Sequence, residues 1–292
     1  MHTFADPIAY AERTRANKLA VVCGDERWTF GEMAVRARKL AGALDALGLE
    51  RGDRVAIWAP NSHHYIEYYQ AVPAAGYVIV PLNTRHAEPE LRYALEDAQA
   101  KVLITDRDPG GLGDCVEHII SIPDEYESFV AGGTERALGE GITEDTLAGL
   151  FYTGGTTGAS KGVMLSHRNL IANTFHSMVM LGLNDDSVYL VMAPLFHAAG
   201  SNSVLACTWA GAAQVAVPTF TPDVVLDLIE RENVTDSLGV PTMIAAMTEL
   251  QLTAPRNVST LKSLGHGGSP IATEVVRRAH QAFPTTELIH LY

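Results

Sequence analysis

Short apolar runs alternate with segments of helical periodicity along most of this 292-residue chain. Residues 54–58 are typical of a buried strand, and residues 62–75, which follow them, are typical of a helix. Further strands are expected at 77–80, 101–104, 187–192, 213–217, 261–264 and 287–290, and further helices at 88–98, 166–181, 240–250 and 271–283, with another beginning at 221. This alternation predicts an α/β fold of layered βα units, with mainly parallel sheets flanked by helices.

The first elements carry local signals of their own. Residues 21–23 and 28–30 are short strand patterns on either side of a Gly-Asp turn, which predicts a hairpin. Thr29, with Glu32 three residues later, forms a capping-box pattern. Because apolar residues then recur at helical spacing up to a glycine, a helix is predicted over about 30–48.

Two stretches interrupt the periodicity. Residues 106–115 and 131–149 are rich in Gly, Asp and Glu, and we interpret them as surface loops or a crossing between two parts. A chain of 292 residues with 47% hydrophobic content can bury a core as one large domain or two modest ones. We therefore expect a first α/β part at about 1–149 and a second at about 150–292.

A glycine-rich segment follows the apolar residues at 150–152. Residues 153–162 contain four glycines, three threonines and one lysine, Lys161. Glycine lacks a Cβ atom, so the backbone can bend sharply and bring successive N–H groups within reach of phosphate oxygens. The threonine hydroxyls and the lysine ammonium add further donors. We interpret the segment as a phosphate-binding loop, with an ordinary surface turn as the alternative.

The spacing within this loop differs from that of a Walker loop. That motif places glycine before its lysine and serine or threonine after it. Here Lys161 follows Ser160 and precedes Gly162. An ordinary P-loop nucleotide hydrolase is therefore disfavoured.

Two later turns also follow predicted strands. The first, at 193–200, contains His197, which by itself is typical of a turn residue bonded to backbone. The second, at 264–271, is glycine-rich and by itself is typical of a tight βα turn. The last predicted strand ends near Tyr292, at the kind of edge where an α/β sheet binds ligands. Each turn needs context before it indicates a site.

The three segments together, in this order, resemble the motifs of the adenylate-forming superfamily of AMP-binding enzymes, acyl-CoA synthetase type. The loop resembles [YF]-T-[ST]-G-[ST]-T-G-x-P-K-G-V and departs from it at Gly154 and Ser160. The segment at 193–200 resembles P-L-[FY]-H, the segment at 264–271 resembles G-G-[AS]-P-[LI], and Tyr292 fits the first letter of Y-G-x-[TS]-E. The resemblance implies the incomplete large N-terminal domain of an acyl-CoA synthetase-like fold, with the small C-terminal domain absent.

The resemblance also implies roles for individual residues. The implied catalytic residues are Thr157, Lys161 and His197, and the implied magnesium contact is Thr153. The implied nucleotide-binding residues are Thr153, Gly154, Gly155, Thr156, Thr157, Gly158, Lys161, Gly267, Gly268, Ser269, Pro270 and Tyr292. The implied substrate-binding residues are His197, Gly200, Ser201, Val240 and Met243.

The activity that the resemblance implies is ATP-dependent activation of a carboxylic acid, fatty or aromatic, to an acyl-adenylate and then to a CoA thioester. ATP, Mg²⁺ and coenzyme A are the implied cofactors, and a small carboxylic acid is the implied substrate. Two alternatives stay open: a fragment that binds nucleotide without catalysis, and an enzyme that forms acyl-AMP without using CoA.

Charge and cysteine content exclude several other functions. A formal net charge of −13 argues against nucleic acid or an anionic membrane surface as the main partner. Three widely spaced cysteines favour reduced thiols in a cytoplasmic protein, and the apolar runs are too short to span a membrane.

His63 and His64 lack the spacing of a metal site, so we expect them on the surface. Whether the protein forms a homodimer stays open.

Overall fold

The computed structural model describes residues 2–153 and 160–291. The strands in these ranges form two sheets, whose neighbouring strands are parallel except at one edge of each sheet. The seven-stranded sheet contains, in spatial order, β13 (Glu287–His290), β12 (Ser263–His266), β11 (Asp236–Gly239), β9 (Val188–Val191), β10 (Ala213–Ala216), β1 (Leu19–Cys23) and β2 (Glu26–Thr29). The six-stranded sheet contains β6 (His118–Ser121), β5 (Ala100–Thr105), β3 (Arg54–Trp58), β4 (Val78–Pro81), β7 (Leu147–Thr153) and β8 (Lys161–Ser166).

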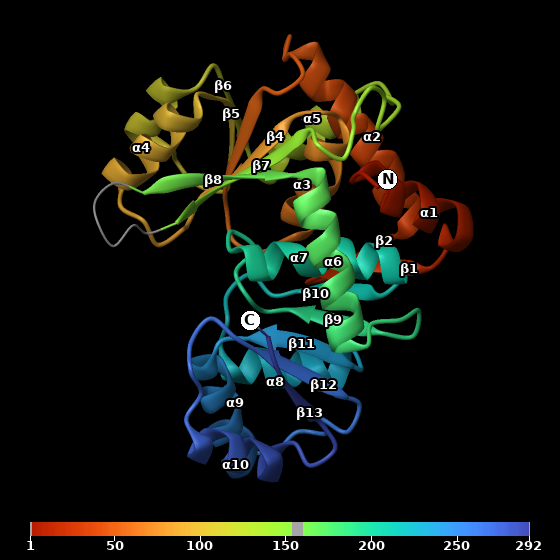
Figure 1. Ribbon diagram of the computed structural model, residues 1–292, viewed down its shortest axis with the longest axis vertical. Helices are drawn as coiled ribbons and strands as arrows, with labels where there is room; N and C mark the ends of the chain where they lie inside the picture. Colours follow the sequence, from red (N-terminus) through yellow and green to blue (C-terminus); the bar gives the residue numbers. More distant parts are fainter. Residues whose placement is uncertain (1, 154–159, 292) are drawn as a thin grey trace.

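Helices cover both faces of each sheet, which confirms the expected layered α/β fold (Figure 1). The helices of the described chain are α1 (Ala5–Arg15), α2 (Phe30–Ala46), α3 (His63–Ala74), α4 (Glu88–Ala98), α5 (Asp124–Gly132), α6 (His167–Leu181), α7 (Ala198–Ala210), α8 (Pro222–Arg231), α9 (Pro241–Thr253) and α10 (Thr273–Ala282), with a 3-10 turn, η1, at Gly110–Cys115. Helices α2, α3 and α7 lie between the sheets in the largest hydrophobic cluster. Helix α4 packs on the outer face of the six-stranded sheet, and α8, α9 and α10 pack on the outer face of the other.

The chain crosses between the sheets more than once. Strands β1 and β2 come first in sequence but join the seven-stranded sheet beside β10. Strand β7 spans residue 149, pairs with β4 and completes the six-stranded sheet together with β8. Each sheet thus contains residues from both sides of position 149, and the division into parts at 1–149 and 150–292 stays a prediction.

The predicted hairpin and the capping box of α2 are confirmed. Strands β1 and β2 pair in antiparallel register. The backbone N–H of Thr29 donates to Glu32 Oε2 (2.8 Å), and the N–H of Glu32 donates to Thr29 Oγ1 (3.3 Å). These two bonds satisfy donors that the first helical turn leaves without partners, so α2 begins at Phe30.

Several elements were not predicted, because distant residues stabilise them. Strand β11 has the sequence Asp-Ser-Leu-Gly, which is a poor strand pattern, yet all four residues are buried. Asp236 accepts hydrogen bonds from Thr235 (2.5 Å) and Ser263 (2.6 Å), and Ser237 donates to the carbonyl of Leu190 (2.8 Å). Two of these partners lie on neighbouring strands. Helices α1 and α5 and strand β6 likewise have only weak helix or strand patterns in their sequences.

Helix α3 is the central element of the fold, because all twelve of its residues are buried. The hydroxyl of Tyr68 donates to the carbonyl of Val55 in β3 (2.7 Å) and accepts the N–H of Val80 in β4 (2.8 Å). The hydroxyl of Tyr69 donates to the carbonyl of Leu195, which follows β9 (2.7 Å). Helix α3 therefore bonds to both sheets.

The expectation that His63 and His64 lie on the surface is wrong. Their residues are 8% and 5% exposed at the start of α3. His64 packs edge-on against Tyr126 of α5, with ring centroids 4.9 Å apart. Because α5 was not predicted, its contact with these imidazoles could not be inferred from the sequence.

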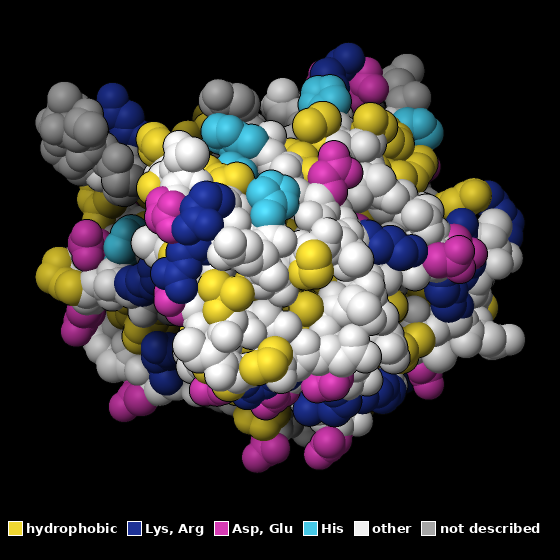
Figure 2. Space-filling model, turned by 90° about the horizontal axis from the view of Figure 1, so that it is seen from below, with side chains coloured by type: hydrophobic (Ala, Val, Ile, Leu, Met, Phe, Trp, Pro, Cys, Tyr) yellow, Lys and Arg dark blue, Asp and Glu magenta, His cyan; other side chains and the backbone are white. Residues whose placement is uncertain are grey.

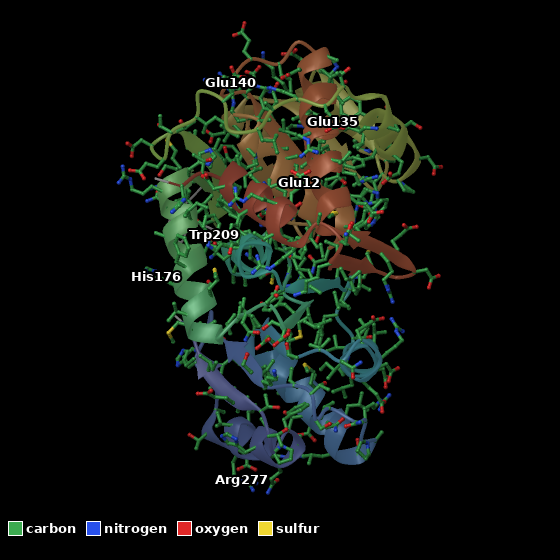
Figure 3. All side chains as sticks on the ribbon, turned by 90° about the vertical axis from the view of Figure 1, so that its right-hand side faces the viewer. Glu12, Glu135, Glu140, His176, Trp209 and Arg277 are labelled. Atoms are coloured by element: carbon green, nitrogen blue, oxygen red, sulfur yellow. The ribbon has the colours of Figure 1, made fainter. Side chains whose placement is uncertain are left out.

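Most charged side chains on the described surface lie in groups that contain both acidic and basic residues. Arg38 of α2 binds Glu12 (2.9 Å) and Glu135 (2.7 Å), which are labelled in Figure 3. Figure 2 shows small groups of both charges, without a continuous basic area, on the described part of the face seen from below. None of the described helices combines the length and the apolar character that a membrane span requires.

Helices α6 and α7 pack side by side near the N-terminal segment. Trp209 of α7 contacts Phe175 of α6 edge-on, with ring centroids 5.3 Å apart, whereas His176 is exposed (Figure 3). At the start of α6, the backbone N–H of Phe4 donates to Nδ1 of the buried His167 (3.2 Å). Burial lowers the pKa of His167 to about 4. The ring is therefore neutral in the folded protein at pH 7.

His167→Gln is expected to make the protein less sensitive to mild acid. The unfolded chain binds a proton on His167 below about pH 6.5, whereas the folded chain does so only near pH 4. The wild-type free energy of unfolding should therefore fall by up to about 3 kcal/mol from this group as the pH drops from 6.5 to 4. Urea unfolding at several pH values measures this.

The matched control is His280→Gln, which removes an exposed histidine of α10. This control should keep the wild-type pH dependence. Equal pH dependence of the wild type and His167→Gln would contradict the prediction.

Candidate functional site

A cavity of about 590 Å³ lies where the carboxyl ends of strands from both sheets approach each other. Asn61, Thr84 and Arg107 line it shortly after β3, β4 and β5 of the six-stranded sheet. Met192 and Val240 line it immediately after β9 and β11 of the seven-stranded sheet. Open α/β folds bind ligands beside the carboxyl ends of their strands. This cavity is therefore the candidate active site.

Asn61 joins the two walls of the cavity. Its side-chain amide donates to the carbonyls of Val191 (3.2 Å) and Ala193 (3.0 Å), and its Oδ1 accepts the N–H of Leu195 (2.8 Å). Asn61 is 5% exposed, so breaking these bonds would leave buried polar groups without partners. The side chain thus positions the segment that leads to His197. This role of Asn61 could not be inferred from the sequence, because its partners are about 130 residues away.

His197 lines the cavity, and the catalytic role that the resemblance implies for it stays a prediction. It is the N-cap residue of α7, it is exposed, and its ring lies 4.5 Å from that of Phe196 between centroids. Partial desolvation lowers the pKa of His197, and the positive charges of Arg85 and His86 lower it further. A neutral imidazole can offer one donor and one acceptor to a ligand.

Two arginines on the cavity wall were missed from the sequence. Arg85 and Arg107 both line the cavity. The guanidinium of Arg107 lies over the ring of Trp58, 4.8 Å from its centroid, and its Nε donates to Asp106 (2.8 Å). The available signal was that each arginine follows a predicted strand by a few residues. Their charges favour an anionic ligand.

The predicted substrate-binding residues divide into two groups. Val240, the N-cap residue of α9, and Met243, in the first turn of that helix, line the cavity. Gly200 and Ser201 are instead buried in α7. A Cβ atom on Gly200 would collide with the carbonyl of Pro194, and the hydroxyl of Ser201 donates to a carbonyl of the same helix (2.9 Å). The contact of Gly200 and Ser201 with a substrate stays a prediction.

The candidate phosphate loop connects β7 with β8 in an antiparallel hairpin (Figure 1). Thr153 and Lys161 are paired in register, and both are exposed. The hydroxyl of Ser160 donates to the carbonyl of Thr153 (2.6 Å), so the serine at the motif's proline position forms a cross-strand bond. Neither Thr153 nor Lys161 is among the described residues that line the cavity. The predicted residues Gly154, Gly155, Thr156, Thr157 and Gly158 lie outside the described residues.

The second glycine-rich turn lies at the carboxyl end of β12. Gly267 is partly exposed, and the next three residues, through Pro270, are exposed. A Cβ atom on Gly267 would collide with the carbonyl of Leu291, which follows the neighbouring strand β13. Glycine is therefore required where these two strands end together. The nucleotide contacts of Gly267, Gly268, Ser269 and Pro270 stay a prediction, and Tyr292 lies outside the described residues.

Comparison with known proteins identifies related sequences. A family model described as AMP-binding enzyme matches residues 9–292. Feruloyl-CoA synthase of Amycolatopsis sp is 36% identical over 269 residues, which cover 91% of this chain and 54% of that protein. A long-chain-fatty-acid–CoA ligase of Thermus thermophilus is 34% identical over 268 residues, covering 86% of this chain and 49% of the relative. The chain thus spans about half the length of the curated relatives that it matches.

Solved structures share the fold. The inhibitor-bound N-terminal domain of FACL13 from Mycobacterium tuberculosis superposes with a TM-score of 0.93 at 24% identity, covering 100% of this chain and 76% of that one. ATP-bound MatB from Rhodopseudomonas palustris superposes with a TM-score of 0.88 at 27% identity, covering 99% of this chain and 60% of that one.

Asn61→Ala is expected to loosen the segment that carries His197. The variant loses three buried hydrogen bonds and leaves the carbonyl of Ala193 and the N–H of Leu195 without their side-chain partner, whereas the carbonyl of Val191 still accepts the N–H of Val217 (3.3 Å). The free energy of unfolding should therefore fall by roughly 2–4 kcal/mol. The N–H of Leu195 should lose protection from hydrogen exchange, because its acceptor is removed. Urea unfolding and exchange measured at Leu195 test both effects.

Tyr69→Phe is the matched control, because it removes a single bond to the carbonyl of the same residue, Leu195. Tyr69→Phe should lower the free energy of unfolding by about 1 kcal/mol and leave the N–H of Leu195 protected from hydrogen exchange. A similar result for the two variants would contradict the positioning role of Asn61.

Proposed function

The chain belongs to the AMP-binding enzyme family, and we propose that the protein activates a carboxylic acid with ATP and transfers the acyl group to coenzyme A. In the first step a carboxylate oxygen bonds to the α-phosphorus of ATP and pyrophosphate leaves. In the second step the CoA sulfur bonds to the acyl carbon, its proton is lost, and AMP leaves. The observation that carries the proposal is the cavity at the carboxyl ends of both sheets, lined by His197, Arg85 and Arg107.

The charges and hydrogen-bonding groups of the cavity suit this chemistry. Two anions, a carboxylate and a phosphate, must approach each other, so the site has to offset negative charge. Arg85 and Arg107 supply positive charge, and the neutral imidazole of His197 can hydrogen-bond to the acid. We assign the binding of the phosphates to Thr153, the residues at 154–158 and Lys161, as the resemblance implies.

The lining favours an acid with a large apolar group. Met192, Phe196, Phe220 and Met243 line the cavity, and burying the apolar surface of a fatty or aromatic acid against them is favourable. The relatives named as feruloyl-CoA synthase and long-chain-fatty-acid–CoA ligase fit these two classes. We propose a fatty or aromatic acid as the substrate.

Magnesium and a cytoplasmic location belong to the same proposal. Mg²⁺ usually binds substrate phosphates and water together with one or two protein oxygens, and the exposed hydroxyl of Thr153 at the end of β7 fits such a contact. The ion would neutralise charge on the phosphates. The free cysteines Cys23, Cys115 and Cys207 are consistent with a reducing compartment.

Lys161→Ala is expected to lower the rate of acyl-adenylate formation by at least 100-fold, because the ammonium group would offset charge that develops on the phosphates. Pyrophosphate exchange with a panel of fatty and aromatic acids measures this step alone. The assay requires a form of the protein as long as its relatives. The melting temperature should change little, because Lys161 is exposed.

Lys262→Ala is the control, since Lys262 is another exposed lysine, outside the hairpin. It should keep the wild-type exchange rate. Absence of exchange with every acid would overturn the proposed function, and an unchanged rate in Lys161→Ala would remove only the lysine from it. Titration of ATP into the 292-residue chain separates nucleotide binding from turnover.

A further inference from the structure

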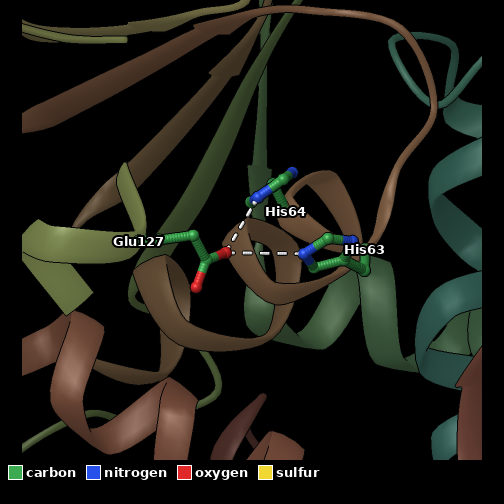
Figure 4. Close-up of side chains that lie close together, drawn as sticks. All are labelled: His63, His64 and Glu127. Atoms are coloured by element: carbon green, nitrogen blue, oxygen red, sulfur yellow. Dashed lines mark hydrogen bonds and ion pairs between the residues drawn. The ribbon is translucent and has the colours of Figure 1, made fainter. Parts of the chain in front are cut away.

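Three potential metal ligands converge where α3 meets α5, and none of them lines the cavity beside His197. Nε2 of His64 lies 2.9 Å from Oε1 of Glu127, and Nε2 of His63 lies 3.5 Å from the same oxygen. The three ligand atoms all lie within 4.8 Å of one another. Figure 4 shows both imidazoles, from the start of α3, directed at the carboxylate of α5.

We propose that His63, His64 and Glu127 form a binding site for a transition-metal ion, most simply Zn²⁺. Zinc binds histidine nitrogen and carboxylate oxygen at roughly 2.0–2.2 Å in a tetrahedron, which places neighbouring ligand atoms about 3.3 Å apart. The observed separations of 2.9 and 3.5 Å lie on either side of this value. Small rotations of the three side chains would therefore complete the geometry.

The imidazoles are held in place by their surroundings. The ring centroid of His63 lies 5.9 Å from that of Trp28 and 3.8 Å from that of His64. The ring of His64 also packs against Tyr126. Such packing means that an ion would find two ligands already ordered. The Glu127 side chain is 39% exposed, so the cluster is open to solvent on the side from which an ion would enter.

Arg36 orients the carboxylate of Glu127. Its two terminal nitrogens donate to the two carboxylate oxygens of Glu127 (2.8 and 2.9 Å), and its Nε donates to Glu67 (2.9 Å). The third ligand is therefore ordered before an ion binds.

Two imidazoles with a carboxylate favour zinc over magnesium or calcium, which prefer oxygen ligands alone. A water molecule can complete the tetrahedron around such an ion.

Calorimetric titration of Zn²⁺ into the chelator-treated 292-residue chain at pH 8 tests this site. We expect one equivalent to bind, and we expect His64→Asn and Glu127→Gln each to weaken binding by at least 100-fold. The matched control is His176→Asn, which removes an exposed histidine of α6 and should bind as the wild type does. Circular dichroism of each variant verifies that it is folded.

Cobalt substitution of the wild type provides a second measurement that needs no variant of the imidazoles. Co²⁺ in the site should show the visible absorption of tetrahedral coordination, which Glu127→Gln should lack. Absence of zinc binding, equal binding by His64→Asn and the wild type, or an octahedral cobalt spectrum would overturn the proposal. His63, His64 and Glu127 would then form a hydrogen-bonded network without a metal ion.

Discussion

Two sheets can share one ligand cavity only if their carboxyl ends are held at a defined separation, and the side chain of Asn61 provides that link. It follows β3 of the six-stranded sheet and bonds to three peptide groups around the end of β9 in the other sheet. All of these groups are buried, and a buried polar group without a partner costs more than its hydrogen bond contributes. The satisfied amide of Asn61 therefore fixes the two cavity walls to each other, together with the hydrogen bond from Tyr69 to Leu195 and the core between the sheets.

Sequence patterns predicted most of the fold because most elements carry their own signals. The capping box at Thr29 and the apolar run of β3 are local, and the structure confirms both. Strand β11 and helix α5 were not predicted, because their stability comes from contacts with residues far along the chain. The error at His63 and His64 had the same cause, since α5 is the element that covers them.

The candidate site was predicted only in part, for a related reason. His197, Val240 and Met243 follow or cap recognisable elements, and all three line the cavity. Sequence alone could not show that Arg85 and Arg107 join them, because that depends on how the two sheets face each other. The glycine-rich loop carries the strongest motif, yet the described residues at its two ends, Thr153 and Lys161, do not line the cavity.

A crystal structure of the 292-residue chain with a non-hydrolysable acyl-adenylate analogue would show whether the cavity beside His197 is the active site. We expect the acyl-phosphate junction to lie within hydrogen-bonding distance of His197, with the acyl group against Met192 and Met243. If the analogue binds at another site and the space beside His197 stays empty, the cavity is not the active site.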